Sequence, residues 1–172
     1  MDAEKLNRQS GTQILVLGGG FAGVYAARRL EKLFAGRSDA RISVVSRDNF
    51  LLMTPLLFEV CSGKLEMSAC SISIREFLRR VDFIEASVEA IDLDRHLVLV
   101  SLGTTEQREL PYDHLVLALG SLTNTRRIDG SELAFTFKTL ADAILLRNYV
   151  IDRMERAEVE SDANIRRRSS RS

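Results

Sequence analysis

Three glycines near the N-terminus, Gly18, Gly20 and Gly23, have the spacing of a loop that binds phosphate groups. The first glycine lets the chain turn sharply, the second leaves room for a pyrophosphate against the backbone, and the third lets a helix pack closely on a strand. A helix that begins at such a loop presents unpaired N–H groups and about half a positive charge to an anion. The pattern indicates dinucleotide binding when a strand precedes it and a helix follows it.

The residues on either side of the loop supply that context. The apolar run Ile14–Leu17 precedes Gly18 and is typical of a strand buried on both faces. After the loop, apolar residues recur at helical spacing and predict a helix over 21–35. A second strand is predicted over Arg41–Ser46, which completes a strand–helix–strand unit of the length usual for mononucleotide binding.

Beyond this unit, apolar segments alternate with turns. The segment Asn49–Val60 contains a proline, so we expect a hydrophobic loop rather than a strand. A helix is predicted over Ser71–Arg80, and a short strand over Asp82–Glu85. The alternating segments Ser87–Leu93 and His96–Leu102 predict an antiparallel hairpin, with a further short strand at 108–110.

Two more elements are expected toward the C-terminus. The apolar run His114–Leu119 predicts a second buried strand that ends at Gly120. The segment Thr139–Ala157 predicts an amphipathic helix. Its inner face is expected to carry Ile144, Leu145, Tyr149 and Met154.

Composition excludes several classes of function. The 172 residues include 24 basic and 24 acidic side chains, so no net charge favours nucleic acid or an acidic membrane as a partner. Cys61 and Cys70 match neither a CxxC motif nor metal-ligand spacing, and we expect two free thiols rather than a redox pair. Because the sequence has only two histidines, His96 and His114, no metal site is expected. Without a signal peptide or a membrane-length apolar run, we expect a cytoplasmic protein.

Several motifs follow one another in a recognisable order. Gly18–Gly23 is similar to an FAD pyrophosphate loop, and Arg47–Phe50 with Thr54–Val60 is similar to the segment after the second strand. Glu85–Asp92 is similar to a strand that passes the adenine, and Tyr112–Ser121 to an ATG-type motif. In this order they resemble the N-terminal part of the FAD-dependent pyridine nucleotide-disulphide oxidoreductase superfamily. Within it, the likeness is to type II NADH dehydrogenases, which are single-chain NADH:quinone oxidoreductases.

The resemblance implies an α/β, Rossmann-like FAD-binding domain with a parallel central sheet, helices and an inserted antiparallel β-hairpin or meander. This domain is incomplete relative to the family. We expect a disordered N-terminus over 1–12, the FAD-binding domain over 13–138, a helix over 139–160 that leads to a missing NADH-binding domain, and a basic flexible tail over 161–172. Because the missing segments normally cover the sheet, self-association or a complementing domain is expected.

The resemblance also implies roles for single residues. The pyrophosphate is expected to bind at Gly18, Gly20, Phe21, Ala22 and Gly23. The isoalloxazine ring is expected beside Thr54, Pro55 and Leu56, and the adenine beside the backbone of Val88. Ala118 and Gly120 are expected to bring the second motif close to the cofactor.

One position departs from the family. The family carries Asp or Glu at the end of the second strand, where the carboxylate accepts hydrogen bonds from the adenosine ribose. Here the matching residue is Ser46, followed by Arg47. A charged acceptor makes a hydrogen bond roughly twice as strong as a neutral one, so adenosine binding is expected to be weaker or altered. Asp48 lies two residues further along the chain and would have to reach back to bind the ribose. Arg47 permits an alternative in which it binds a 2′-phosphate, although we favour the interpretation that Arg47 is a surface loop residue.

The function implied is hydride transfer from NADH to FAD, with electrons passed on to a quinone. The flavin supplies the chemistry, and no side chain is nominated as catalytic. The resemblance therefore implies FAD as cofactor, with NADH as co-substrate and a quinone as partner in a full-length context. Family members associate with the inner face of the membrane through segments absent here.

Two alternatives stay open. The first is a non-catalytic nucleotide-binding or interaction module, a truncated paralogue that keeps the glycine loop without turnover. The second is a small NAD(P)-dependent dehydrogenase, which we rank last because Tyr25 and Tyr112 have no lysine at helical spacing.

Overall fold

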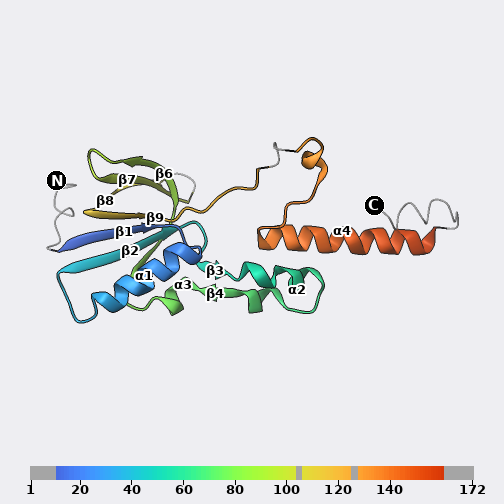
Figure 1. Cartoon of the computed structure of the whole chain (residues 1–172), viewed down its shortest axis with the longest axis horizontal. Coiled ribbons are helices and arrows are strands. Elements are labelled where there is room, and N and C mark those ends of the chain that lie inside the picture. The colour runs from blue at the N-terminus through green and yellow to red at the C-terminus, as the bar shows by residue number, and fades with distance from the viewer. Residues whose placement is uncertain (1–10, 104–105, 125–127, 161–172) are drawn as a thin grey trace. The chain divides into compact units, whose positions relative to one another are not determined.

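The computed structural model describes residues 11–103, 106–124 and 128–160. The chain divides into two compact units, coloured along the chain in Figure 1. Unit 1 comprises residues 1–51 and 72–121, and unit 2 comprises residues 52–71 and 122–172. Most of the segment predicted to be disordered at the N-terminus, and the basic tail predicted over 161–172, lie outside the described residues.

A four-stranded parallel sheet forms the centre of unit 1. Its strands are β1 (Thr12–Leu17), β2 (Ala40–Ser46), β5 (Asp82–Glu85) and β9 (His114–Leu117), in the spatial order β5-β2-β1-β9. Helix α1 (Phe21–Leu33) connects β1 to β2. The predicted strand–helix–strand unit is confirmed, with bounds one or two residues from those expected.

The two faces of this sheet are covered by different layers (Figure 1). Successive residues of a strand point to opposite faces. Val16 therefore packs with Val24 and Ala27 of α1, whereas Leu15 and Leu17 pack toward an antiparallel sheet on the other face. That sheet contains β6 (Ser87–Asp92), β7 (Leu97–Leu102) and β8 (Glu106–Pro111). The predicted hairpin and the short strand after it are confirmed as this three-stranded meander.

Strand β9 lies at one edge of the parallel sheet, and this corrects the prediction of a buried strand over His114–Leu119. In the described part of the chain, β9 pairs with β1 alone. Leu117 is 61% exposed as a result, and Leu119, just beyond the strand, is 58% exposed. An apolar run does not distinguish a central strand from an edge strand, because the difference depends on how many neighbours the strand has.

The segment after β2 contains a strand where the sequence predicts a hydrophobic loop. Strand β3 (Phe50–Leu52) pairs with β4 (Ser71–Ser73). Pro55 lies beyond this strand, in the 3₁₀-helix Thr54–Leu56. Pro55 therefore excludes a strand only at its own position, and the apolar residues before it pair with β4.

The helix predicted over Ser71–Arg80 is much shorter in the structure. Helix α3 covers only Ile74–Phe77. Ser73 caps its N-terminus by accepting a hydrogen bond from the backbone N–H of Glu76 at 3.4 Å. The backbone is extended again at Leu78, so the helix ends after one turn.

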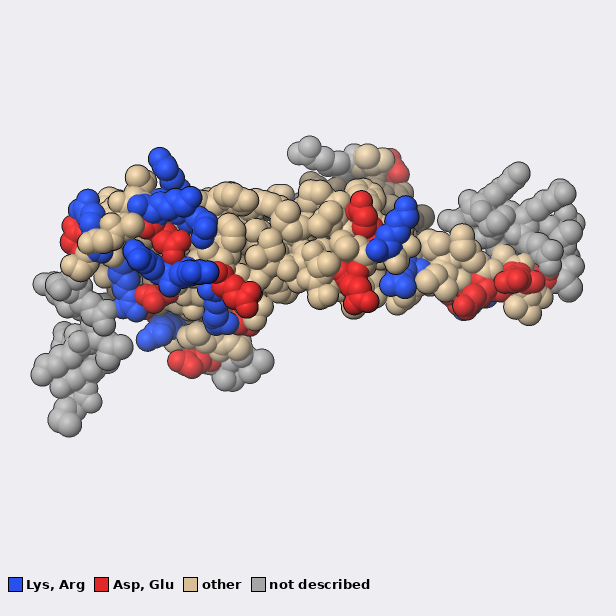
Figure 2. Space-filling view, turned by 90° about the horizontal axis from the view of Figure 1, so that it is seen from below, with Lys and Arg blue, Asp and Glu red and all other residues tan. Residues whose placement is uncertain are grey.

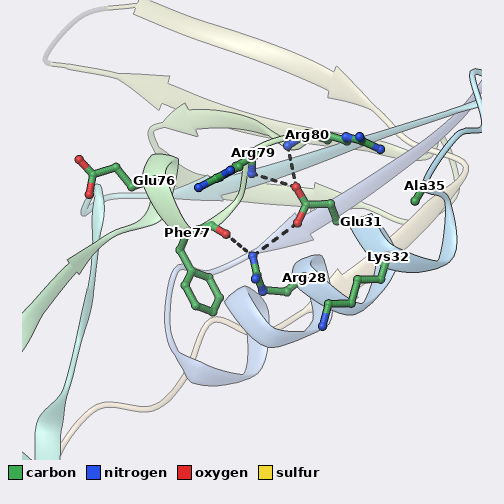
Figure 3. Close-up of a pocket in the computed structure, with 8 residues that line it drawn as sticks. All are labelled: Arg28, Glu31, Lys32, Ala35, Glu76, Phe77, Arg79 and Arg80. Atoms are coloured by element: carbon green, nitrogen blue, oxygen red, sulfur yellow. Dashed lines mark hydrogen bonds and ion pairs between the residues drawn. The ribbon is translucent and has the colours of Figure 1, made fainter.

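Glu31 of α1 explains why the helix does not continue (Figure 3). Its Oε1 accepts hydrogen bonds from the backbone N–H groups of Arg79 and Arg80 at 2.9 and 2.7 Å. Its Oε2 lies 3.8 Å from Arg28, which donates to the Phe77 carbonyl at 2.5 Å and covers the Phe77 ring. The Glu31 side chain is only 11% exposed. These contacts hold the chain before β5 against α1 in a non-helical conformation.

Lys and Arg side chains gather over the face of unit 1 that bears α1, with acidic side chains between them (Figure 2). Exposed ion pairs join Arg37 to Asp39 at 2.6 Å and Arg41 to Asp82 at 2.5 Å. The hydrogen bond from Arg37 lowers the pKa of Asp39, and the same bond raises the pKa of Arg37. Exposed pairs of this kind contribute little to stability, because water screens them.

Unit 2 contains helix α2 (Leu57–Cys61) and the long helix α4 (Leu140–Val159), which pack against each other. Two further 3₁₀-helices cover Met67–Cys70 and Ser131–Leu133. The Phe58 and Phe137 rings meet at 4.9 Å between centroids. The helix predicted at the C-terminal end is confirmed.

The predicted inner face of α4 is only partly correct. Ile144 and Tyr149 are half-buried, as expected, but Leu145 is 59% and Met154 68% exposed. The one fully buried residue of the helix is Ala143. Because α2 spans only five residues, it covers a narrow stripe of α4, and periodicity alone did not identify that stripe.

A capping box fixes the start of α4. The Asp142 N–H donates to Thr139 Oγ1 at 3.1 Å, and the Asp142 carboxylate accepts from the Thr139 N–H at 2.8 Å. The carboxylate also accepts from the Lys138 N–H at 2.9 Å and from Thr136 Oγ1 at 2.7 Å. These hydrogen bonds, the one from Lys138 first, lower the pKa of Asp142 to about 2.

Replacing Glu31 tests the junction between α1 and the turn before β5. We expect Glu31→Ala to lower the free energy of unfolding by about 1.5–3 kcal/mol, because hydrogen bonds to a charged group are lost. Lys32→Ala, at the exposed neighbouring position, is the matched control and should change it by less than about 0.5 kcal/mol. Urea unfolding monitored by circular dichroism measures both. Equal losses for the two variants would contradict the role given to Glu31.

Replacing Asp142 tests the cap of α4 through its pH dependence. Above the ordinary pKa of Asp, about 3.9, Asp142→Asn should lower unfolding free energy by about 1 kcal/mol. Because the folded pKa is lowered, the stabilisation is present above that value and is lost as the pH falls toward about 2. Urea unfolding between pH 2 and pH 7 should therefore show the unfolding free energies of wild type and Asp142→Asn converging in acid.

Asp152→Asn, in an exposed pair with Arg156, is the control and should show no comparable loss of unfolding free energy. A difference between Asp142→Asn and wild type that persisted unchanged at pH 2 would contradict this account.

Candidate functional site

The turn between β1 and α1 leaves no room for a side chain at its first glycine. Gly18 has φ +115°, which disfavours any residue with a Cβ, and its N–H donates to the Val45 carbonyl at 2.8 Å. A Cβ at Gly18 would overlap the backbone carbonyl of Ala118. The turn is therefore fixed by a close approach of two backbone segments.

The third glycine of the motif serves the packing of the helix. Gly23 is buried in the first turn of α1, where a Cβ would overlap the Gly18 carbonyl oxygen. A Cβ at Gly19 would meet Ser46 Oγ and the side chain of Ile74. The glycines thus let the helix, the turn and the end of β2 meet closely, as the sequence predicts for Gly23.

Gly20, in contrast, faces open space. It is exposed, and a Cβ there would meet nothing within 4 Å. Gly20 precedes α1 as a residue without a capping side chain, and the first turn, which begins with exposed Phe21 and Ala22, carries no acidic residue. The first N–H groups of the helix are therefore available to an anion, and their dipole favours one. This geometry fits a pyrophosphate.

The second motif reaches the same place from β9. The Ala118 N–H donates to the Leu17 carbonyl at 2.8 Å, so Ala118 continues along β1 to the turn. Gly120 follows two residues later with φ +77° and is exposed. Ala118 thus lies against the glycine turn, and Gly120 provides a second position at which the chain turns.

Ser46 ends β2 beside the glycine turn. A Cβ at Gly19 would overlap the Ser46 Oγ, and in the described part of the chain no hydrogen bond engages this hydroxyl. Its carbonyl accepts from the Ala86 N–H at 3.0 Å. Arg47 and Asp48 follow on the exposed loop.

Val88 lies in β6, on the other side of the sheet from α1. It is half-buried and packs on the cluster that contains Leu17 and Val45. The register of β6 on β7 shifts between Val88 and Ala90. The structure therefore places Val88 in the same unit as the glycine turn, while its contact with an adenine stays a prediction.

The three residues predicted beside the flavin ring belong to unit 2. Thr54, Pro55 and Leu56 form a 3₁₀-helix in which Thr54 and Pro55 are exposed. The Leu56 N–H donates to the Met53 carbonyl at 2.9 Å. Their role beside a cofactor stays a prediction.

Glu85 is a residue of the site region to which sequence reasoning gave no role. It ends β5 and is in register with Ser46 of β2. The sequence showed Glu85 as the last residue of a short strand and the first residue of the motif over 85–92, with no role of its own. A pairing between segments that lie far apart in the chain leaves no local signal that could have identified it.

The cysteines take no part in this region. Both are free thiols, as expected; Cys70 is buried, and its Sγ donates to the Met67 carbonyl at 3.0 Å. Cys61 lines an apolar hollow of about 820 Å³ in unit 2, together with Phe58, Phe137 and Arg147. Across residues 11–103, 106–124 and 128–160, no group of three His, Cys, Asp or Glu side chains could hold a metal ion. No helix in those ranges is long and apolar enough to cross a membrane.

Known proteins match the region of the chain that carries the parallel sheet, the glycine turn and the meander. Residues 12–157 match the pyridine nucleotide-disulphide oxidoreductase family. The chain is 30% identical over 166 residues to a mitochondrial external alternative NADH-ubiquinone oxidoreductase of Yarrowia lipolytica, covering 90% of this chain and 28% of the relative. It is 32% identical over 160 residues to a type II NADH:quinone oxidoreductase of Mycobacterium tuberculosis, covering 87% of this chain and 32% of the relative.

A solved structure shows the same fold. The NDH2 protein of Plasmodium falciparum, in complex with NADH, superposes with a TM-score of 0.76 and 26% identity, covering 90% of this chain and 32% of that one. The chain therefore spans about a third of the length of these relatives. The parallel sheet, the glycine turn and the antiparallel meander agree with a Rossmann-like fold. The chain belongs to the pyridine nucleotide-disulphide oxidoreductase family.

Proposed function

We propose that the Gly18–Gly23 turn and the first turn of α1 bind the pyrophosphate of FAD. The observation that carries this proposal is the open space at Gly20 in front of the uncapped N-terminus of α1. Phe21 and Ala22 contribute backbone N–H groups there, and a helix N-terminus favours an anion. The family membership of residues 12–157 supports FAD as the nucleotide.

The remaining predicted residues contribute other parts of the nucleotide site in our proposal. Ala118 and Gly120 close the second motif over the nucleotide, and the backbone of Val88 contacts the adenine. The Ser46 hydroxyl lies close enough to the turn to accept one hydrogen bond from the adenosine. Arg47 is a surface loop residue. Thr54, Pro55 and Leu56 present backbone to the flavin ring.

We further propose that the chain is the FAD-binding part of an NADH:quinone oxidoreductase. The relatives named above are NADH-ubiquinone and NADH:quinone oxidoreductases, which supports this reaction. FAD would supply hydride acceptance and electron transfer, and the chain's residues would bind and orient it. A GxGxxG motif occurs once in these 172 residues, and we assign it to FAD. The FAD-binding part would cover 13–138, and the helix over 139–160 would lead to an NADH-binding domain.

A non-catalytic nucleotide-binding module is the second candidate. The observation that favours it is Ser46, because an uncharged hydroxyl replaces the carboxylate that binds adenosine in this family. Absorbance and fluorescence titration of the purified chain with FAD separates the candidates. Saturable binding supports the FAD-binding part. A chain that takes up no FAD, but binds ADP, supports the module.

Gly20→Ala tests the pyrophosphate site directly. The added methyl group enters space that the fold leaves empty, so stability should fall by no more than about 1 kcal/mol, the cost of alanine at an N-cap. The same methyl group obstructs the phosphate, and FAD should bind at least about tenfold more weakly, a difference of about 1.4 kcal/mol. Fluorescence titration and urea unfolding measure the two quantities.

Two comparisons make this test specific. Gly23→Ala places its methyl group on the Gly18 carbonyl, so it should destabilise the fold by about 1–3 kcal/mol as well as weaken binding. Arg29→Ala, on the exposed side of α1, should change neither quantity. Unchanged FAD affinity in a well-folded Gly20→Ala protein would overturn the proposed site.

A further inference from the structure

We propose that Glu85 supplies the carboxylate that binds the adenosine ribose, in place of the acidic residue that Ser46 replaces. This role rests on the proposed nucleotide site. It assigns to the end of β5 the hydrogen-bond acceptor that the family places at the end of β2.

Strand register brings the two residues together. Ser46 and Glu85 are the last pair in the parallel pairing of β2 with β5. Neighbouring strands lie about 4.8 Å apart, so the two Cα atoms are separated by one strand spacing. Both residues lie at the carboxyl edge of the sheet, which is where open α/β sheets bind their ligands.

The two side chains also share a face of the sheet. Val44 and Phe83, two residues earlier on each strand, pack in the same cluster with Val24 of α1. Because side chains alternate along a strand, Ser46 and Glu85 point to this same side. Ser46 Oγ lies beside Gly19, so this is the side on which the glycine turn lies.

The surroundings of Glu85 leave its carboxylate available. The side chain is 51% exposed, and its Oε2 lies 3.8 Å from Arg75, whose guanidinium covers the Phe83 ring. This ion pair is longer than a hydrogen bond, and in the described chain no hydrogen bond engages the carboxylate. Arg75 therefore lies beside the carboxylate but makes no hydrogen bond to its oxygens. The ribose 2′ hydroxyl is a donor that fits such a group.

Binding of ADP and 2′-deoxy-ADP to the purified chain tests this role. Both ligands carry the pyrophosphate and the adenine, and they differ only in the 2′ hydroxyl of the ribose, which 2′-deoxy-ADP lacks. Calorimetric titration should show that wild-type protein binds ADP about tenfold more tightly than 2′-deoxy-ADP. Glu85→Gln should bind ADP about tenfold more weakly than wild type and lose this preference, while its affinity for 2′-deoxy-ADP stays unchanged. Restoring an acid at the family's position, in the double variant Ser46→Asp with Glu85→Gln, should restore the preference.

Asp48→Asn is the matched control, because Asp48 is the other carboxylate close to Ser46 in the sequence. It should behave as wild type, and loss of the preference in this variant would transfer the role to Asp48. Retained preference in Glu85→Gln would overturn the proposal. Tighter binding of ADP that carries an added 2′-phosphate than of ADP itself would overturn it too, because Arg47 would then bind the 2′-phosphate. If wild type binds neither FAD nor ADP, the proposed nucleotide site itself fails; if it binds both without the preference, only the role of Glu85 fails.

Discussion

The close approach of three backbone segments at the carboxyl end of β1 is the constraint on which the rest of unit 1 depends. Gly18 turns the chain against Ala118, and Gly23 brings α1 onto Gly18 so closely that a methyl group on either glycine would overlap a carbonyl oxygen. This contact sets where α1 starts, and therefore where its uncapped N–H groups point. The parallel order β5-β2-β1-β9 then places the ends of β2, β5 and β9 around the same spot.

This constraint explains why the core of the site was predictable from the sequence. Glycine at positions that need φ above zero or a missing Cβ is a local requirement, and it leaves a local signature. The apolar runs of β1 and β2 and the helical spacing of α1 add patterns that a few neighbouring residues express. The strand–helix–strand unit, the glycine turn and the meander therefore followed from the sequence, with small differences at their ends.

The features that were mispredicted depend on contacts between distant segments. The helix expected after Ser73 ends early because Glu31, on another element, binds the N–H groups of Arg79 and Arg80. Strand β9 has the composition of a central strand, but it is exposed because it has one neighbour among the strands that the structure describes. The buried stripe of α4 depends on the short helix α2 that covers it. Local patterns contain none of these partners.

The same distinction applies to the chemistry of the site. Ser46 in isolation indicates a weakened adenosine subsite, because a hydroxyl accepts more weakly than a carboxylate. Strand register supports our proposal of a second acceptor, since it places the Glu85 side chain one strand away and on the same face. A carboxylate at the end of a neighbouring parallel strand occupies nearly the same edge of the sheet as one at the end of β2. In our proposal the acceptor has therefore moved from β2 to β5, while the glycine turn, fixed by its backbone contacts, stays where it is.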